Sequence, residues 1–209
     1  GLCFMRKIKR LTGLCIFFTL WIALISSGCT PNGGPATTVK DFDQLLTSLH
    51  QGGKYVFEDL PWLISKEEVM KQKQLNDSHS VREDVLKIEG TFPFNNSSLE
   101  QTVLFVFDDD KFVSGEYLFS TTNQDQFIKF CEELKTRLKK SLPEPFGNDL
   151  SVLNNTKNIG AQGKSVMWKG EDGSYLRINL FTTAQQGDKM RYTVQIKSES
   201  PAPERKGLQ

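Results

Sequence analysis

The sequence predicts an α+β domain in which a unit of one helix and three strands occurs twice. Three observations support this. Apolar residues recur at helical spacing at the start of each unit and alternate along the later segments. Acidic turns join neighbouring strands as hairpins. The order helix, strand, strand, strand appears in both halves, so two three-stranded antiparallel blocks are expected to form one sheet with helices on one face. The repeat is one of element order, not of sequence.

Two helices are expected ahead of the first strands. The first covers residues 38–50 and ends at Gly52-Gly53. Its apolar residues are Val39, Phe42, Leu45, Leu46 and Leu49. The second begins at Ser65, because Ser65-Lys66-Glu67-Glu68 has the pattern of a capping box, in which the serine and the glutamate each accept a hydrogen bond from the other's backbone N–H.

Three strands are expected next. They cover residues 85–94, 101–107 and 111–120. Asp108-Asp109-Asp110 joins the last two. A calcium loop of the EF-hand type needs glycine at its sixth place, where this chain has Val113, so the three aspartates predict a solvated hairpin turn.

The second unit begins with a helix over residues 123–141, which Pro143 ends. Cys131 lies on its apolar stripe and is predicted to be a buried structural thiol. Three further strands are expected over residues 164–169, 174–181 and 189–197, with Glu171-Asp172-Gly173 as the turn between the first two.

Residues 1–28 are predicted to be a secretory signal peptide that starts at Met5. A cluster of four basic residues is followed by the apolar run 14–25 and then by Ser27-Gly28-Cys29. Small residues ahead of a cysteine resemble the lipobox of bacterial lipoproteins, and this resemblance implies a diacylglycerol on Cys29. The lipobox usually has Leu, Val or Ile three places before the cysteine, where this chain has Ser26.

The alternative is an uncleaved anchor helix, since residues 11–28 carry no charge and approach the length that spans a bilayer. Both interpretations place the domain on the extracytoplasmic face of a cell membrane, because a basic segment stays inside and the chain after it is translocated.

The rest of the chain divides into three parts. Residues 29–37 hold the lipidated cysteine and a flexible tether, residues 38–197 form one domain, and residues 198–209 are predicted to be disordered. Without residues 1–28 the chain has 22 Lys and Arg against 25 Asp and Glu, a net charge of −3. This charge gives no basic patch for nucleic acid. Cys131 is then the remaining unmodified cysteine, so no internal disulfide is expected.

Catalytic and metal-binding patterns are absent from the sequence. His50 and His79 have no partner at ligand spacing, and Ser78 beside His79 in a polar loop is not placed to act as a nucleophile. The chain has no Gly-x-Ser-x-Gly elbow, no Ser-x-x-Lys pair and no phosphate loop. We therefore expect no catalysis, no metal and no cofactor.

A second resemblance concerns the domain. Trp62, Ser65 and Glu67-Glu68-Val69 resemble a pattern of uncharacterised bacterial lipoproteins, Trp-Gly-x-Ser-x-Glu-Glu-Val, with Leu63 in place of the glycine. The order of elements over residues 65–197 is similar to that of the beta-lactamase-inhibitor-protein-like and small outer-membrane-assembly lipoprotein families. Members of these families bind other proteins, and this resemblance implies a binding role.

These observations predict a lipid-anchored binding module that contacts another envelope protein or envelope component. A sheet face without helices would present Leu104, Val106 and Leu118 as an apolar binding surface. Two alternatives stay open: a small-ligand carrier or sensor with a pocket between sheet and helices, and an envelope hydrolase with a site built from scattered polar residues.

Overall fold

The structure is a computed structural model that describes residues 38–154, 165–187 and 189–201. All of these belong to Pro31–Gln209, the second of two units into which the chain divides. The predicted signal peptide, Cys29 and the tether lie outside the described residues. Among the helices that are described, none is long and apolar enough to cross a membrane.

The described residues form three α-helices, two 3-10 turns and nine strands. In chain order they are α1 (Phe42–Leu49), β1 (His50–Gln51), β2 (Lys54–Tyr55), α2 (Lys66–Lys73), the 3-10 turn η1 (Asp77–His79), β3 (Ser80–Arg82), β4 (Val85–Phe94), β5 (Ser97–Asp108), β6 (Lys111–Thr121), α3 (Gln124–Ser141), the 3-10 turn η2 (Leu150–Asn154), β7 (Val166–Lys169), β8 (Tyr175–Ala184) and β9 (Met190–Glu199).

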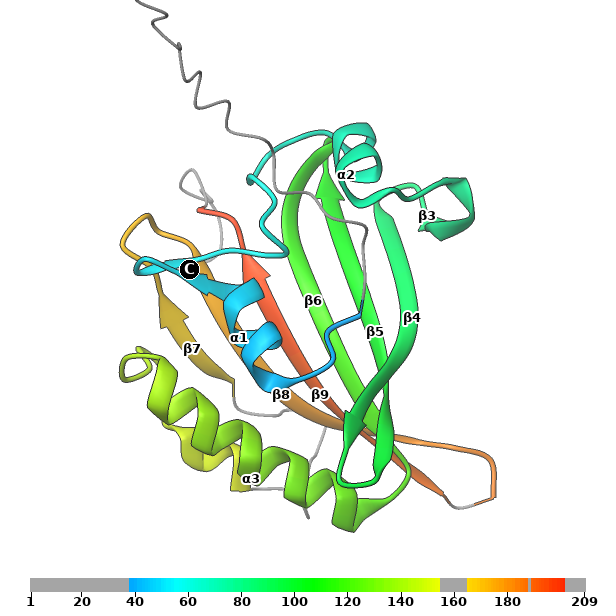
Figure 1. The fold of residues 1–209 in the computed structure, drawn as a ribbon, viewed down its shortest axis with the longest axis vertical. Coiled ribbons are helices and arrows are strands. Elements are labelled where there is room, and N and C mark those ends of the chain that lie inside the picture. Colours follow the sequence, from blue (N-terminus) through cyan, green and yellow to red (C-terminus); the bar gives the residue numbers. More distant parts are fainter. Residues whose placement is uncertain (1–37, 155–164, 188, 202–209) are drawn as a thin grey trace, which may run out of the picture. The chain divides into compact units, whose positions relative to one another are not determined.

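Within the described residues, seven strands form one sheet in the order β3-β4-β5-β6-β9-β8-β7, and every neighbouring pair is antiparallel. The block β4-β5-β6 meets the block β9-β8-β7 along β6 and β9 (Figure 1). The predicted α+β class with two three-stranded blocks is confirmed. The short edge strand β3 and the two-stranded β1-β2 ribbon are additions.

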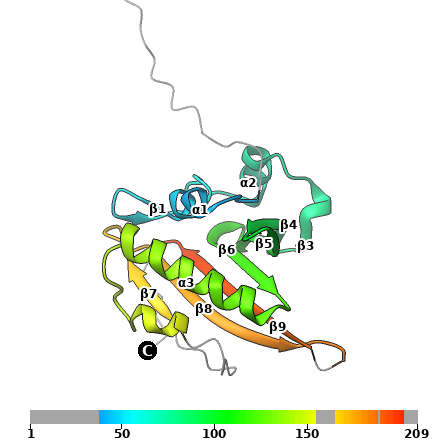
Figure 2. The same ribbon diagram turned by 60° about the horizontal axis from the view of Figure 1, so that its bottom comes forward.

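One face of the sheet is covered, and its core is aromatic. Helices α1 and α3 lie on the same side of the sheet (Figure 2). The ring of Phe42 from α1 lies 5.2 Å from Phe92 of β4 and 5.3 Å from Phe130 of α3. Phe130 in turn lies 5.2 Å from Phe119 of β6. These rings join two helices to two strands, and each such pair contributes about 1 kcal/mol beyond its buried area.

The helix starts follow their capping residues. Helix α1 starts later than predicted, because the Asp41 side chain accepts the Gln44 N–H at 2.8 Å and so begins the helix at Phe42. Ser65 caps α2 as predicted, by accepting the Glu68 N–H at 3.2 Å. The second half of the predicted capping box is not formed, since the Glu68 carboxylate accepts a hydrogen bond from Gln72 instead.

Two-residue turns set the register of the first block. Asp109 and Asp110 have φ of +49° and +58°, which confirms the predicted acidic hairpin. Asn95 and Asn96 form an equivalent turn, with φ of +48° and +59°. Positive φ at both positions is the type I′ geometry that joins twisted strands. The predicted start of the second strand at residue 101 was wrong, because the asparagine turn lets β5 begin at Ser97.

The prediction of a disordered tail from residue 198 was wrong at its start. Strand β9 continues to Glu199, and Ser198 is completely buried on the covered face. The Ser200 N–H then donates to the Val113 carbonyl at 2.9 Å. A serine at the buried position 198 does not continue the apolar alternation that predicts a strand. The sequence pattern therefore ends before the strand does. Residues 202–209 lie outside the described residues.

The segment between β2 and α2 crosses the covered face and lies directly on β6 at Gly115. The ring of Phe57 is fully buried there, 4.9 Å from the ring of Tyr117 and 5.5 Å from that of Phe105. A Cβ on Gly115 would overlap the ring of Phe57 at Cδ1. Glycine is therefore required at this position because another side chain occupies the space of its Cβ.

We expect Gly115→Ala to lower the free energy of unfolding by about 2 kcal/mol, because the added methyl group must displace a buried ring. Gly90→Ala is the matched control, since its Cβ would meet the partly exposed Thr38 side chain, with Cγ2 at 2.5 Å, and not a buried ring. Urea unfolding of the two variants measures both effects. Equal losses of stability would show that the approach of Phe57 to β6 is not a tight constraint.

Candidate functional site

The predicted binding residues Leu104, Val106 and Leu118 all lie on the face of the sheet opposite α1 and α3. Their neighbours across the strands are Glu116, Ser114 and Thr102, respectively. All three side chains are partly exposed. They form an apolar patch on β5 and β6, which we call the open-face patch.

A layer of hydrogen-bonded polar side chains continues from this patch across β6, β9 and β8. The Gln195 amide donates to Glu116 at 2.7 Å, and the Asn179 amide donates to Gln195 at 3.1 Å. Ser165 donates to Asn179 at the far end. The row follows the strand register, in which Asn179 pairs with Gln195 and Gln195 pairs with Leu118. The polar layer therefore borders the open-face patch directly.

Charges within this layer balance one another. Lys197 lies 3.7 Å from Glu116 and 3.4 Å from Glu199, and Arg177 lies 3.5 Å from Glu199. The four groups carry no net charge together. Partly exposed pairs of this kind contribute little to stability, about 0–1 kcal/mol each, so their main effect is to hold the side chains in fixed positions on the sheet.

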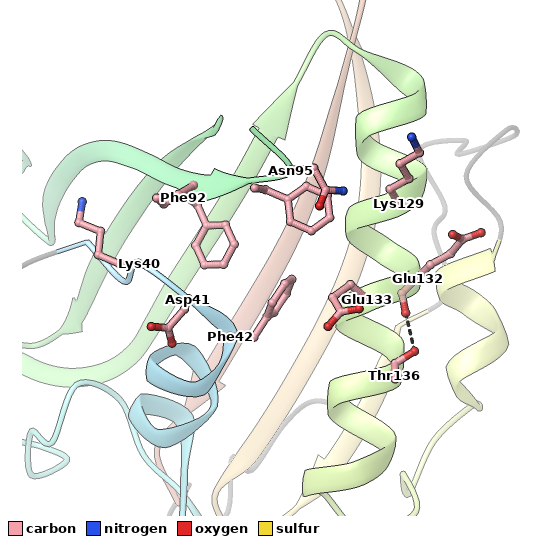
Figure 3. A pocket seen from close by; sticks show the side chains of 11 residues that line it. Lys40, Asp41, Phe42, Phe92, Asn95, Lys129, Glu132, Glu133 and Thr136 are labelled. Atoms are coloured by element: carbon pink, nitrogen blue, oxygen red, sulfur yellow. Dashed lines mark hydrogen bonds between the residues drawn. The ribbon is translucent and has the colours of Figure 1, made fainter. Parts of the chain in front are cut away.

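A groove lies on the covered face, between the start of α1, the end of β4 and the middle of α3 (Figure 3). Its volume is about 510 Å³. Phe42, Phe92 and Phe94 lie along one side of it, and Lys129, Glu132 and Glu133 of α3 lie along the other. The side chains of Phe42 and Phe92 are buried, so the exposed lining of the groove is more polar than apolar.

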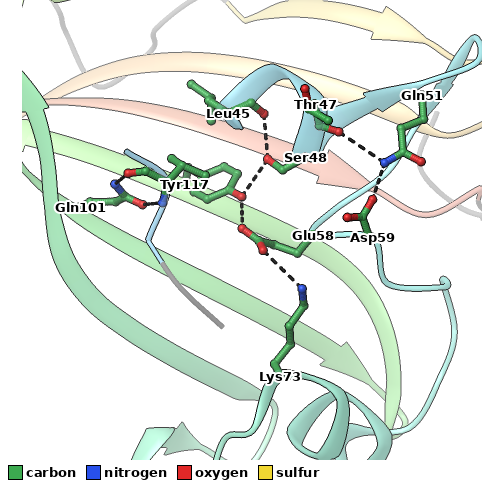
Figure 4. A network of polar contacts seen from close by, with 10 residues as sticks. Leu45, Thr47, Ser48, Gln51, Glu58, Asp59, Lys73, Gln101 and Tyr117 are labelled. Atoms are coloured by element: carbon green, nitrogen blue, oxygen red, sulfur yellow. Dashed lines mark hydrogen bonds and ion pairs between the residues drawn. The ribbon is translucent and has the colours of Figure 1, made fainter. Parts of the chain in front are cut away.

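A buried polar network lies where β6 meets residues 56–65, the segment between β2 and α2 that we call the crossing segment (Figure 4). The Tyr117 hydroxyl donates to the Glu58 carboxylate and lies 2.9 Å from the Ser48 hydroxyl. Lys73 of α2 reaches the other Glu58 oxygen at 3.4 Å, and its side chain is only 5% exposed. Burial, followed by the charge of Glu58, raises the pKa of Tyr117 well above its usual value, so the tyrosine remains protonated and donates. The network joins four segments and has a structural role.

Gln101 makes a second buried polar contact on the same face. Its amide oxygen accepts the Val39 N–H at 2.8 Å, and its amide nitrogen donates to the Val39 carbonyl at 2.8 Å. Two hydrogen bonds therefore hold Val39 to the middle of β5, on the covered face of the sheet.

The residues considered for chemistry are placed in structural roles. Cys131 is fully buried, as predicted, and burial raises the pKa of its thiol to about 12. The Ser78 hydroxyl donates to the Asn76 side chain at 2.5 Å, and Nδ1 of His79 also lies within hydrogen-bond distance of Asn76. Among the described residues, no group of three or more His, Cys, Asp or Glu side chains is arranged to hold a metal ion.

Comparisons with models of known protein families, with curated proteins and with solved structures find no match to this chain. Its function must therefore be argued from its own residues.

Sequence reasoning did not find the Glu58–Lys73 pair. The two residues lie 15 positions apart in a segment without periodicity, and Tyr117 is 59 positions from Glu58. The positive φ of Glu58, +55°, has no counterpart in any sequence pattern.

We expect Lys73→Met to lower the free energy of unfolding by about 3 kcal/mol, because the Glu58 carboxylate would stay buried without its cation. Glu58→Gln combined with Lys73→Met removes both charges and keeps an acceptor for Tyr117, so it should recover a large part of that loss. Urea unfolding of the single and double variants tests the coupling. A double variant that is no more stable than Lys73→Met would contradict it.

Proposed function

We propose that the protein is a lipid-anchored, extracytoplasmic lipoprotein whose domain binds another protein of the cell envelope through the open face of its sheet. The observation that carries this proposal is the asymmetry of the sheet. One face is buried under helices and an aromatic core, whereas the other presents the open-face patch beside a fixed polar layer. A partly exposed apolar patch with a polar border is the composition of a protein-binding surface.

The first described residues also leave the open-face patch uncovered. Val39 lies on the covered face, where its backbone is bonded to the Gln101 side chain. Thr38 lies against Gly90 on the same face.

We expect Cys29→Ala to abolish lipid attachment and release the domain from the membrane, because each buried CH₂ of the acyl chains contributes about 0.8 kcal/mol to anchoring. Metabolic labelling with a fatty acid, followed by membrane fractionation, measures both effects. A variant that is labelled as strongly as the wild-type protein would rule out Cys29 as the modified residue.

We expect Leu118→Lys to reduce partner capture at least tenfold, because a charge placed in the patch must be desolvated when the complex forms. Thr122→Lys is the matched control, since it adds the same charge at an exposed position outside the sheet. The measurement is cross-linking of the anchored protein in its own membranes, with quantitative mass spectrometry of the captured proteins. Equal capture by both variants would exclude the open face as the binding surface.

A further inference from the structure

Strand β4 is an edge of the sheet for most of its length. The short strand β3 pairs only with Val85 and Leu86. From Lys87 to Phe94, β4 has no strand neighbour on its outer side within the described residues, and Figure 1 shows it as the border of the sheet below β3. The unpaired stretch covers eight of the ten residues of the strand.

The register shows which backbone groups point outward. Phe94 and Ser97 flank a two-residue turn, so they exchange both hydrogen bonds with each other. Bonded and non-bonded positions alternate along an antiparallel pair. Residues 88, 90, 92 and 94 therefore bond to β5, and the N–H groups of Lys87, Glu89 and Thr91 point away from the sheet. Pro93 has no N–H and offers only its carbonyl at the end of this row.

Natural edges are often protected by proline and charged residues. Here the protection is partial. Pro93 closes only the last position, and the side chains of Lys87 and Glu89 pair with each other at 2.7 Å. Three outward N–H groups remain in a row. This length suits a short extended segment of a partner protein.

The edge borders a recess on the covered side. Phe92, Pro93 and Phe94 of β4 form one wall of the groove of about 510 Å³, and Phe42 lies at its centre (Figure 3). A strand added beside β4 would place alternate side chains on the covered side of the sheet. Such a side chain next to Phe92 would lie over the groove, so backbone hydrogen bonds and a side-chain contact are available to the same ligand.

We propose that the outer edge of β4 binds an extended peptide segment of a partner protein as an additional strand, with one side chain of that segment in the groove between β4 and α3. The outward N–H groups of Lys87, Glu89 and Thr91 supply the backbone hydrogen bonds, and the groove supplies side-chain preference. This inference rests on the proposed protein-binding function, but it uses a surface other than the open-face patch.

The test uses the full chain in detergent and a displayed library of random heptapeptides. Thr91→Pro removes one outward N–H without breaking a bond to β5, and edge strands tolerate proline. Thr91→Val is the matched control, because it keeps the N–H. We expect peptides that bind the wild-type protein and Thr91→Val but bind Thr91→Pro at least tenfold more weakly. Methylation of alternate amide nitrogens in a selected peptide should abolish binding.

Amide hydrogen exchange locates the bound peptide. We expect saturating peptide to slow exchange at Lys87, Glu89 and Thr91 at least tenfold, and to leave Ile88 and Gly90, which already bond to β5, unchanged. A selection that yields no peptide sensitive to Thr91→Pro, or binding without protection of these three amides, would overturn the proposal. Leu118→Lys should bind the peptides normally, so a failure of the edge site is distinguishable from a failure of the open-face patch.

Discussion

The contact of Phe57 with the backbone of β6 at Gly115 fixes the path of the segment on which the rest of the covered face depends. Before this contact, the Tyr55 N–H donates to the Ser174 hydroxyl at 2.9 Å, in the turn between β7 and β8. After it, the Leu63 N–H donates to the Phe112 carbonyl at 2.9 Å, at the start of β6. One segment, with a turn at Glu58 and Asp59, thus connects the two blocks of the sheet. Because Phe57 must lie against β6, the next residue, Glu58, is delivered to Tyr117 and Lys73.

The periodic elements could be predicted from the sequence, and the crossing segment could not. Helix α3 starts after its capping residue Asn123 and ends at Ser141, within one residue of the prediction, because its apolar stripe and the later proline are local signals. The path of the crossing segment depends on a missing Cβ at Gly115, which no local pattern reveals. The Asn95-Asn96 turn is a different case, since two consecutive asparagines are a recognisable signal for positive φ.

Leu63 has a backbone conformation that is unfavourable for a residue with a side chain. The lipoprotein pattern that this region resembles has glycine at this position, and the structure gives Leu63 a φ of +67°. Left-handed backbone costs a side-chain-bearing residue about 1–2 kcal/mol, whereas glycine adopts it freely. The backbone conformation at position 63 of this chain therefore favours glycine over leucine. The leucine side chain in this chain is 45% exposed, so core packing does not compensate for that cost.

The two candidate binding surfaces would recognise a partner in different ways. On the open face, Glu116, Lys197, Glu199 and Arg177 are already paired. A partner that covered them would not need complementary charges, because each charge keeps its counter-ion while both lose water. Discrimination there would come from the shape of the open-face patch.

At the β4 edge the bound element would be backbone, which every protein carries, and discrimination would come from the one side chain that enters the groove between β4 and α3. An open-face contact alone favours any partner with a matching apolar surface, and an edge contact alone favours any extended segment. A partner that offers both at the correct separation gains from the two contacts together, because the second forms at the high effective concentration that the first creates.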